Sequence, residues 1–197
     1  MTKLLLNLLP LVLTTVSTGT ATADSYFTCR SCHGDEGQGN PAINAPRIAG
    51  QLEDYLARQL ANFRDGVRGG QPGDTYGGQM ALMAATLDSA AIAELAVSVA
   101  GMANWPGPTQ PGPTSGDELY QPCAACHGAK GEGNAALLAP RIIGMDSRYL
   151  ARQLRNFRDG IRGKNPKDSA GQTMRAALSG PLTDTTIEKL SHYIENM

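Results

Sequence analysis

Two short cysteine motifs carry the clearest chemistry in this sequence. Each has two cysteines separated by two residues and followed at once by a histidine, and the second copy lies 94 positions after the first. The copies span Cys29–His33 and Cys123–His127, and together they use all four cysteines of the chain. This C-x-x-C-H pattern is typical of c-type haem attachment, in which both thiols bond to one porphyrin and the histidine binds its iron.

We therefore expect two covalently attached haem c groups, each with its iron. The expected attachment residues are Cys29, Cys32, Cys123 and Cys126, and the expected first iron ligands are His33 and His127.

Other interpretations of the cysteines are weaker. A single C-x-x-C-H motif can also be half of a zinc site, a redox dithiol or a chance match. Two cysteine pairs can bind one zinc ion, but the loop between the pairs is usually far shorter than here. Two complete motifs behind an export signal and inside an internal repeat favour two haems.

The N-terminal residues 1–23 have the features of a secretory signal peptide. Lys3 supplies the positive charge, residues 4–16 are mostly apolar, and Ala21–Ala23 fits a cleavage site. The apolar run is short for a transmembrane helix, although an uncleaved anchor is the alternative. We expect export to the periplasm, with cleavage near Ala23, and leave open a peripheral contact with the membrane surface.

An internal duplication organises the rest of the chain. Residues 24–102 form one unit, residues 103–115 predict a stiff linker rich in proline and glycine, and residues 116–197 repeat the first unit. The stretches 55–69 and 149–163 differ at only two positions. Because aromatic residues make up only 5% of the chain, each domain is expected to need its haem in order to fold.

The periodicity of apolar residues predicts an all-α fold. Leu52, Leu56, Leu60 and Phe63 share one face of a middle helix, which Gly66 is placed to end. The last helix of the first unit is expected to start at Asp88 or Ser89. Its partner in the second unit is expected to start at Thr183 or Asp184.

Methionines are the natural candidates for the second axial position of each iron. The only histidine outside the motifs is His192, which could serve at most one iron. The offset of 94 positions pairs Met80 with Met174, whereas Met83 falls opposite Ala177. We predict Met80 and Met174 as iron ligands, with Met83 as the alternative in the first unit.

A second repeated segment follows each histidine by about thirteen residues. It reads Ala-Pro-Arg-Ile at 45–48 and again at 139–142. The proline carbonyl can accept a hydrogen bond from the free ring nitrogen of the histidine, and the arginine can pair with a haem propionate. An ordinary turn and a solvated charge are the alternatives. The candidate haem-binding residues in these segments are Pro46, Arg47, Pro140 and Arg141.

The two units differ in charge. Residues 24–102 hold nine acids and five bases, a net charge of −4, and residues 117–197 hold nine acids and eleven bases, a net charge of +2. We hypothesise that the two ends attract different redox proteins. Nucleic acid is not expected as a partner, because the mature chain is mildly acidic and exported.

The order of attachment motif, proline-containing loop, helix, methionine loop and helix resembles small class I cytochromes c. Two such domains behind a signal peptide resemble the dihaem cytochrome c4 family, over the whole mature chain. The resemblance implies tandem all-α domains related by a pseudo-twofold axis, with the haem propionates facing each other and His/Met ligation at both irons. It also implies electron transport, from a donor such as a quinol:cytochrome c oxidoreductase to an acceptor such as a terminal oxidase.

One departure from that pattern concerns the first helix. Gly116 and Tyr120 precede Cys123, as expected for the N-terminal helix of such a domain. Tyr26 matches Tyr120, but position 22 lies inside the predicted signal peptide. Either the first helix is truncated or the cleavage site lies earlier.

An electron carrier is favoured over an enzyme, because two protein ligands on each iron leave no position open for a substrate. One alternative is a subunit of a periplasmic dehydrogenase, such as the cytochrome subunit of a sulfide-oxidising flavoprotein. A dihaem peroxidase or a thiosulfate-oxidising cytochrome would need an open iron or a cysteine ligand, and no cysteine is spare.

Overall fold

The computed structural model describes residues 25–103, 116–178 and 182–197, and every structural statement below refers to these ranges. The predicted signal peptide and all but the first residue of the predicted linker lie outside them. Within them the chain is helical and has two isolated β-bridges but no strand. The predicted all-α fold is confirmed.

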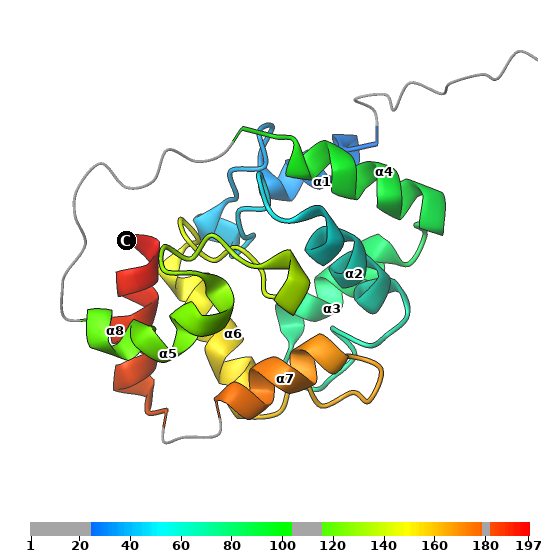
Figure 1. The fold of residues 1–197 in the computed structure, drawn as a ribbon. Helices are drawn as coiled ribbons and strands as arrows, with labels where there is room; N and C mark the ends of the chain where they lie inside the picture. Colours follow the sequence, from blue (N-terminus) through cyan, green and yellow to red (C-terminus); the bar gives the residue numbers. More distant parts are fainter. Residues whose placement is uncertain (1–24, 104–115, 179–181) are drawn as a thin grey trace, which may run out of the picture.

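The helices form two groups that lie side by side (Figure 1). Domain 1 contains α1 (Phe27–His33), the 3-10 helix η1 (Pro41–Ile43), α2 (Glu53–Arg64), α3 (Thr75–Ala84) and α4 (Ser89–Ala100). Domain 2 contains α5 (Asp117–His127), the 3-10 helix η3 (Ala135–Leu137), α6 (Ser147–Arg158), α7 (Ser169–Ala177) and α8 (Asp184–Glu195). Each element of domain 1 has its counterpart in domain 2.

Helix starts follow from capping side chains. Asp88 caps α4 by accepting a hydrogen bond from the backbone N–H of Ala91, and Thr183 caps α8 in the same way through Thr186. Both starts agree with the sequence prediction. Helix α1 has seven residues and α5 has eleven, so the described first helix is the shorter one, as the departure from the family pattern suggested.

The predicted methionine loops are wrong, because Met80 and Met174 lie inside helices α3 and α7. Each helix is preceded by a capping aspartate, Asp74 or Asp168, whose carboxylate accepts a hydrogen bond from the glycine N–H three residues later. Such caps stabilise a helix start. Glycines in the first turns of α3 and α7 weaken the helix propensity, so the sequence did not predict helices at Met80 and Met174.

Each domain has its own apolar core beside its cysteine motif. In domain 1, α2 packs on α4, and Tyr26 of the α1 start joins Leu56, Leu95 and Val99. In domain 2, α6 packs on α8, and the buried core comprises Tyr120, Met145, Leu150, Ala151, Leu154, Ile187, Leu190 and Ile194. Met145 therefore has a structural role in domain 2.

The contact between the domains repeats itself with the 94-position offset of the sequence. Arg58 in α2 donates to the backbone carbonyl of Leu138 at 2.9 Å, and Arg152 in α6 donates to the backbone carbonyl of Asn44 at 3.1 Å. The two donors are counterparts, and so are the two acceptors. This exchange is what a pseudo-twofold relation between like domains produces.

No single helix in the described ranges is long and apolar enough to cross a membrane. Helices α3 and α4 meet that test only when taken together, and they are bent by 116° at the break between them.

Candidate haem-binding sites

The histidine of each cysteine motif is buried and held by the predicted proline carbonyl. His33 and His127 are each only 6% exposed. Nδ1 of His33 lies 2.7 Å from the carbonyl oxygen of Pro46, and Nδ1 of His127 lies 2.9 Å from that of Pro140. This hydrogen bond fixes the ring and leaves Nε2 as the nitrogen for a metal.

Both histidines favour the neutral state. Burial lowers the pKa of His33 and of His127, and the hydrogen bond to the proline carbonyl only partly opposes it. Neutral imidazole is the form that binds metals. The two side chains are therefore preorganised to bind a metal.

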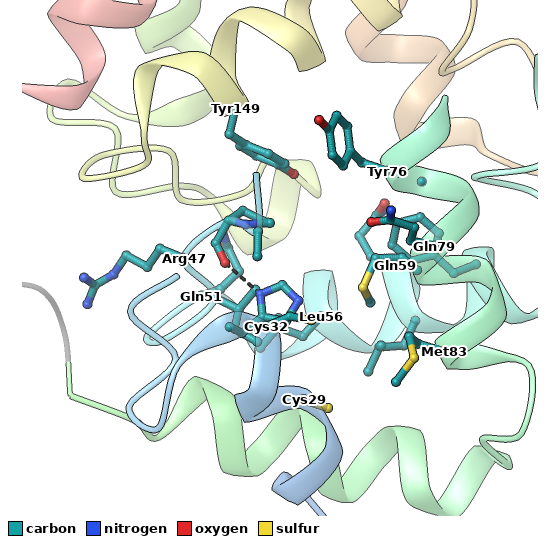
Figure 2. A pocket seen from close by; sticks show the side chains of 18 of the residues that line it. Cys29, Cys32, Arg47, Gln51, Leu56, Gln59, Tyr76, Gln79, Met83 and Tyr149 are labelled. Carbon is teal, nitrogen blue, oxygen red and sulfur yellow. Dashed lines mark hydrogen bonds between the residues drawn. The ribbon is translucent and has the colours of Figure 1, made fainter. Parts of the chain in front are cut away.

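The cysteines of each motif lie on one helix, three residues apart and thus on neighbouring turns of the same face. Cys29 and Cys123 are partly buried, whereas Cys32 and Cys126 are exposed. Burial raises the pKa of the Cys29 and Cys123 thiols. In domain 1 both cysteines line the same cavity as the histidine (Figure 2).

The cavity of domain 1 has a volume of about 290 Å³. Its walls include six of the predicted site residues, namely Cys29, Cys32, His33, Pro46, Arg47 and Met80. Figure 2 shows Met83 of α3 across the cavity from Cys29 and Cys32. Apolar side chains of α2, Leu56 among them, line the space between. Thiols and an imidazole on one wall, with a thioether facing them, fit a covalently attached haem.

The structure brings both candidate methionines of domain 1 to this cavity. Met80 is partly buried, and Met83 is 47% exposed. In domain 2, Met174 and Cys123 both pack against the core that contains Tyr120 and Leu150. The internal repeat favours Met80 over Met83 as the candidate iron ligand, because Met83 has no methionine counterpart in domain 2.

Close approach of two backbone segments in each domain requires glycine. A Cβ atom on Gly39 would lie 2.5 Å from the backbone nitrogen of Arg47, and one on Gly133 would lie 2.6 Å from that of Arg141. Both glycines also have positive φ angles. They let the loop after each histidine run against the proline–arginine segment.

Arg47 and Arg141 approach each other where the domains meet. Burial lowers the pKa of Arg47, and the positive charge of Arg141 lowers it further. Arg47 also donates a hydrogen bond to the backbone carbonyl of Ala103 at 3.3 Å. Two like charges held together favour an anionic group between them, and this fits the predicted role in binding haem propionates.

A second cationic group at the interface escaped the sequence analysis. Arg68 donates to Gln59 at 2.7 Å and to Gln153 at 3.0 Å, and Arg162 donates to Gln153 at 2.7 Å and to Gln59 at 2.9 Å. Both arginines are over 90% buried. We call these four residues the Arg–Gln quartet. All four recur in the duplicated stretch, which was the available signal.

Four interface arginines keep buried atoms without a hydrogen-bond partner among the described residues. These atoms are Nε of Arg58, Arg68, Arg152 and Arg162. Burying a charge without an anion is costly. Anionic propionates in this region would offset that cost, so the interface also fits two haems.

Known proteins resemble this chain in sequence and in fold. A family model for Cytochrome c matches residues 114–197. Cytochrome c4 of Azotobacter vinelandii is 31% identical over 182 residues, which cover 86% of this chain and 84% of that protein. A thiosulfate dehydrogenase electron acceptor of Stutzerimonas stutzeri is 30% identical over 86% of this chain and 78% of its own length.

The crystal structure of reduced recombinant cytochrome c4 from Pseudomonas stutzeri superposes with a TM-score of 0.72 at 27% identity. The match covers 89% of this chain and 96% of that one. The pairing of two helical domains is therefore shared along nearly the whole length of both proteins.

Proposed function

Because the chain belongs to the cytochrome c4 family and carries two covalently attached haem c groups, we propose that it shuttles single electrons between proteins of a periplasmic respiratory chain. The observation that supports this best is the repeated site: in both domains a buried histidine of a C-x-x-C-H motif is held by a proline carbonyl. Two like sites in contact suit relay of an electron from one end of the molecule to the other.

In this proposal the haems supply the iron that alternates between the ferrous and ferric states. His33 and Met80 bind the iron of domain 1, and His127 and Met174 bind that of domain 2. With a histidine and a methionine bound, the iron would have no position left for a substrate or water, so the protein would act as a carrier and not as an enzyme. A thioether ligand also favours ferrous iron and raises the reduction potential.

The remaining predicted residues hold the porphyrins. Cys29 and Cys32 attach one haem, and Cys123 and Cys126 attach the other. Pro46 and Pro140 orient the histidines through their carbonyl groups. Arg47 and Arg141 neutralise propionates, and the Arg–Gln quartet adds positive charge beside them.

Export and domain limits belong to the same proposal. We place the signal peptide at residues 1–23, domain 1 at 24–102, the linker at 103–115 and domain 2 at 116–197. The apolar N-terminus with its small-residue cleavage site supports removal of the first segment. Haem attachment outside the cytoplasm agrees with export.

The partners proposed are a quinol:cytochrome c oxidoreductase as donor and a terminal oxidase as acceptor. A relative named as the electron acceptor of thiosulfate dehydrogenase supports a second possibility, in which the donor is a periplasmic dehydrogenase. Stable co-purification with such a dehydrogenase would favour the second donor. Electron transfer to an isolated oxidase would support the first acceptor.

Charge suggests where a partner docks on domain 2. A surface groove of about 340 Å³ is lined by Arg158, Lys164 and Arg175. Arg158 is paired with Asp184, whereas Lys164 and Arg175 are exposed and form no salt bridge within the described ranges. Arg175 directly follows Met174, so an acidic redox protein docked here would lie close to the iron of domain 2.

The counterpart surface of domain 1 has no such charge. Gly70 and Ala81 occupy the positions of Lys164 and Arg175, and α3 contains no charged residue. Leu82 of α3 is 79% exposed. We propose that domain 1 docks a less polar surface, so that each domain receives a different partner.

A redox titration of the haem-loaded protein, followed by absorption spectroscopy, tests the function. The expected result is two one-electron steps at positive potentials, with a far-red methionine–iron band in the oxidised protein. A high-spin iron that binds added ligands would instead mean that a methionine is not bound, and would favour a dihaem enzyme.

A further inference from the structure

A single side chain of domain 1 is hydrogen-bonded to the peptide that holds the histidine of domain 2. Oε1 of Gln51 accepts a hydrogen bond from the backbone N–H of Arg141 at 2.9 Å. Nε2 of the same side chain donates to the carbonyl oxygen of Arg141 at 2.8 Å. Gln51 also lines the cavity of domain 1 (Figure 2) and is only 4% exposed.

The geometry joins three groups in one chain of hydrogen bonds. The N–H of Arg141 and the carbonyl of Pro140 belong to the same peptide group. On one side that peptide N–H donates to Gln51, and on the other side its carbonyl lies 2.9 Å from Nδ1 of His127. Gln51 therefore acts on the histidine of the other domain through one peptide bond.

Hydrogen bonds within the protein hold the side-chain amide of Gln51 in one orientation. Its Oε1 accepts a second hydrogen bond from the backbone N–H of Leu52 at 2.9 Å. With three hydrogen bonds in a buried place, the amide has little freedom to turn. Its effect on the Pro140–Arg141 peptide is therefore constant.

The pseudo-twofold relation is broken at this position. The counterpart of Gln51 in domain 2 is Met145, which is buried in the core of that domain. A thioether has neither an amide oxygen nor an N–H donor, so it cannot make the same pair of hydrogen bonds. The Gln51 amide therefore acts only on His127. Met145, at the counterpart position, cannot make the matching hydrogen bonds toward the peptide that holds His33.

We propose that Gln51 is a positioning residue that lowers the reduction potential of the domain 2 haem across the domain boundary. Hydrogen bonds in a chain polarise one another, so an acceptor on the peptide N–H makes the peptide carbonyl a stronger acceptor. A stronger acceptor at Nδ1 increases the electron donation of the histidine to the metal. Greater donation stabilises ferric iron and lowers the potential.

This inference rests on the proposed ligation by His127, and its test separates the two. The unmodified protein must first show two one-electron steps, each assigned to a domain by the haem-methyl proton signals. Failure of that result would overturn the proposed function. The role of Gln51 is then measured by how substitutions move the domain 2 step and the Nδ1 proton signal of His127.

Gln51→Met places at position 51 the same residue type that domain 2 has at the counterpart position, Met145. The expected result is a higher midpoint for the domain 2 step, a smaller change for domain 1, and an upfield shift of the His127 Nδ1 proton in the ferrous protein. Gln51→Glu keeps an oxygen acceptor for the Arg141 N–H. It should move that proton signal in the opposite direction or leave it in place.

Gln153→Met is the matched control, because it makes the same chemical change at the domain contact. Gln153 accepts hydrogen bonds from Arg68 and Arg162, and among the described residues no hydrogen bond joins it to the Pro140–Arg141 peptide. The control should not raise the domain 2 midpoint selectively. An unchanged domain 2 midpoint in Gln51→Met, or the same selective rise in Gln153→Met, would overturn the proposal.

Discussion

Arg162 of domain 2 donates a hydrogen bond to the phenol oxygen of Tyr55 in domain 1 at 3.1 Å. The same guanidinium stacks over the ring of Phe157, with its carbon 4.5 Å from the ring centre. Burial would raise the pKa of Tyr55, but the positive charges of Arg162 and its counterpart Arg68 outweigh burial and lower the pKa below its usual value. The contact joins a buried arginine of domain 2 to helix α2, which lines the cavity of domain 1.

Replacing Arg162 by methionine should loosen the domain contact. The variant removes the arginine donor of Tyr55 and one of the two arginine donors of Gln59 and of Gln153, at a cost of about 2–4 kcal/mol. Denaturant unfolding of the haem-loaded protein should show this loss and a separation of the two domain transitions. Arg148→Met is the control, because it removes only an exposed pair with Asp146 worth about 0–1 kcal/mol. Equal losses in both variants would contradict the prediction.

Methionine substitutions should identify the sixth ligands. Met80→Ala and Met174→Ala should each remove the far-red band of one haem and allow that iron to bind added cyanide. Met83→Ala is the matched control within α3 and should keep both bands. If Met83→Ala opens the iron and Met80→Ala does not, the assignment from the repeat is wrong and Met83 is the ligand.

Alkaline pH should destabilise domain 2 through Tyr120. Burial raises the pKa of this phenol to about 12, and its hydroxyl donates to the carbonyl of Gly128 at 2.6 Å. The folded pKa lies above the unfolded value of about 10, so the contribution to stability is complete below pH 10 and is lost as the pH rises toward 12. Tyr120→Phe should cost about 1 kcal/mol at neutral pH and show a shallower alkaline loss. Parallel pH profiles would refute this role.

Charge reversal in the basic groove should slow electron exchange with anions. Oxidation of the ferrous protein by hexacyanoferrate(III) should be about threefold to tenfold slower for Lys164→Glu at low salt, and the difference should shrink as salt is added. Lys189→Glu on α8 makes the same change in net charge away from the groove and should have a smaller effect. Equal slowing in both variants would mean that the net charge of the protein, and not the groove, controls the rate.

The sequence by itself determined the chemistry and the repetition. Attachment motifs work over a few residues of one helix, so their spacing is enough to predict the haem-attaching thiols and His33. The expected hydrogen bond from Nδ1 of His33 to the proline carbonyl is present. Helix starts at Asp88 and Thr183 also depend on nearby residues and were predicted. The 94-position offset predicted the two like domains, because duplicated segments fold alike.

The tertiary structure determined the polar contacts between the two domains. Polar residues such as Gln59 and Arg68 are expected at a surface, and only the opposing domain buries them against Arg162. The contact between Gln51 and Arg141 joins residues 90 positions apart on different domains, so no local pattern encodes it. The contacts that link the two sites arise only when the domains pack against each other.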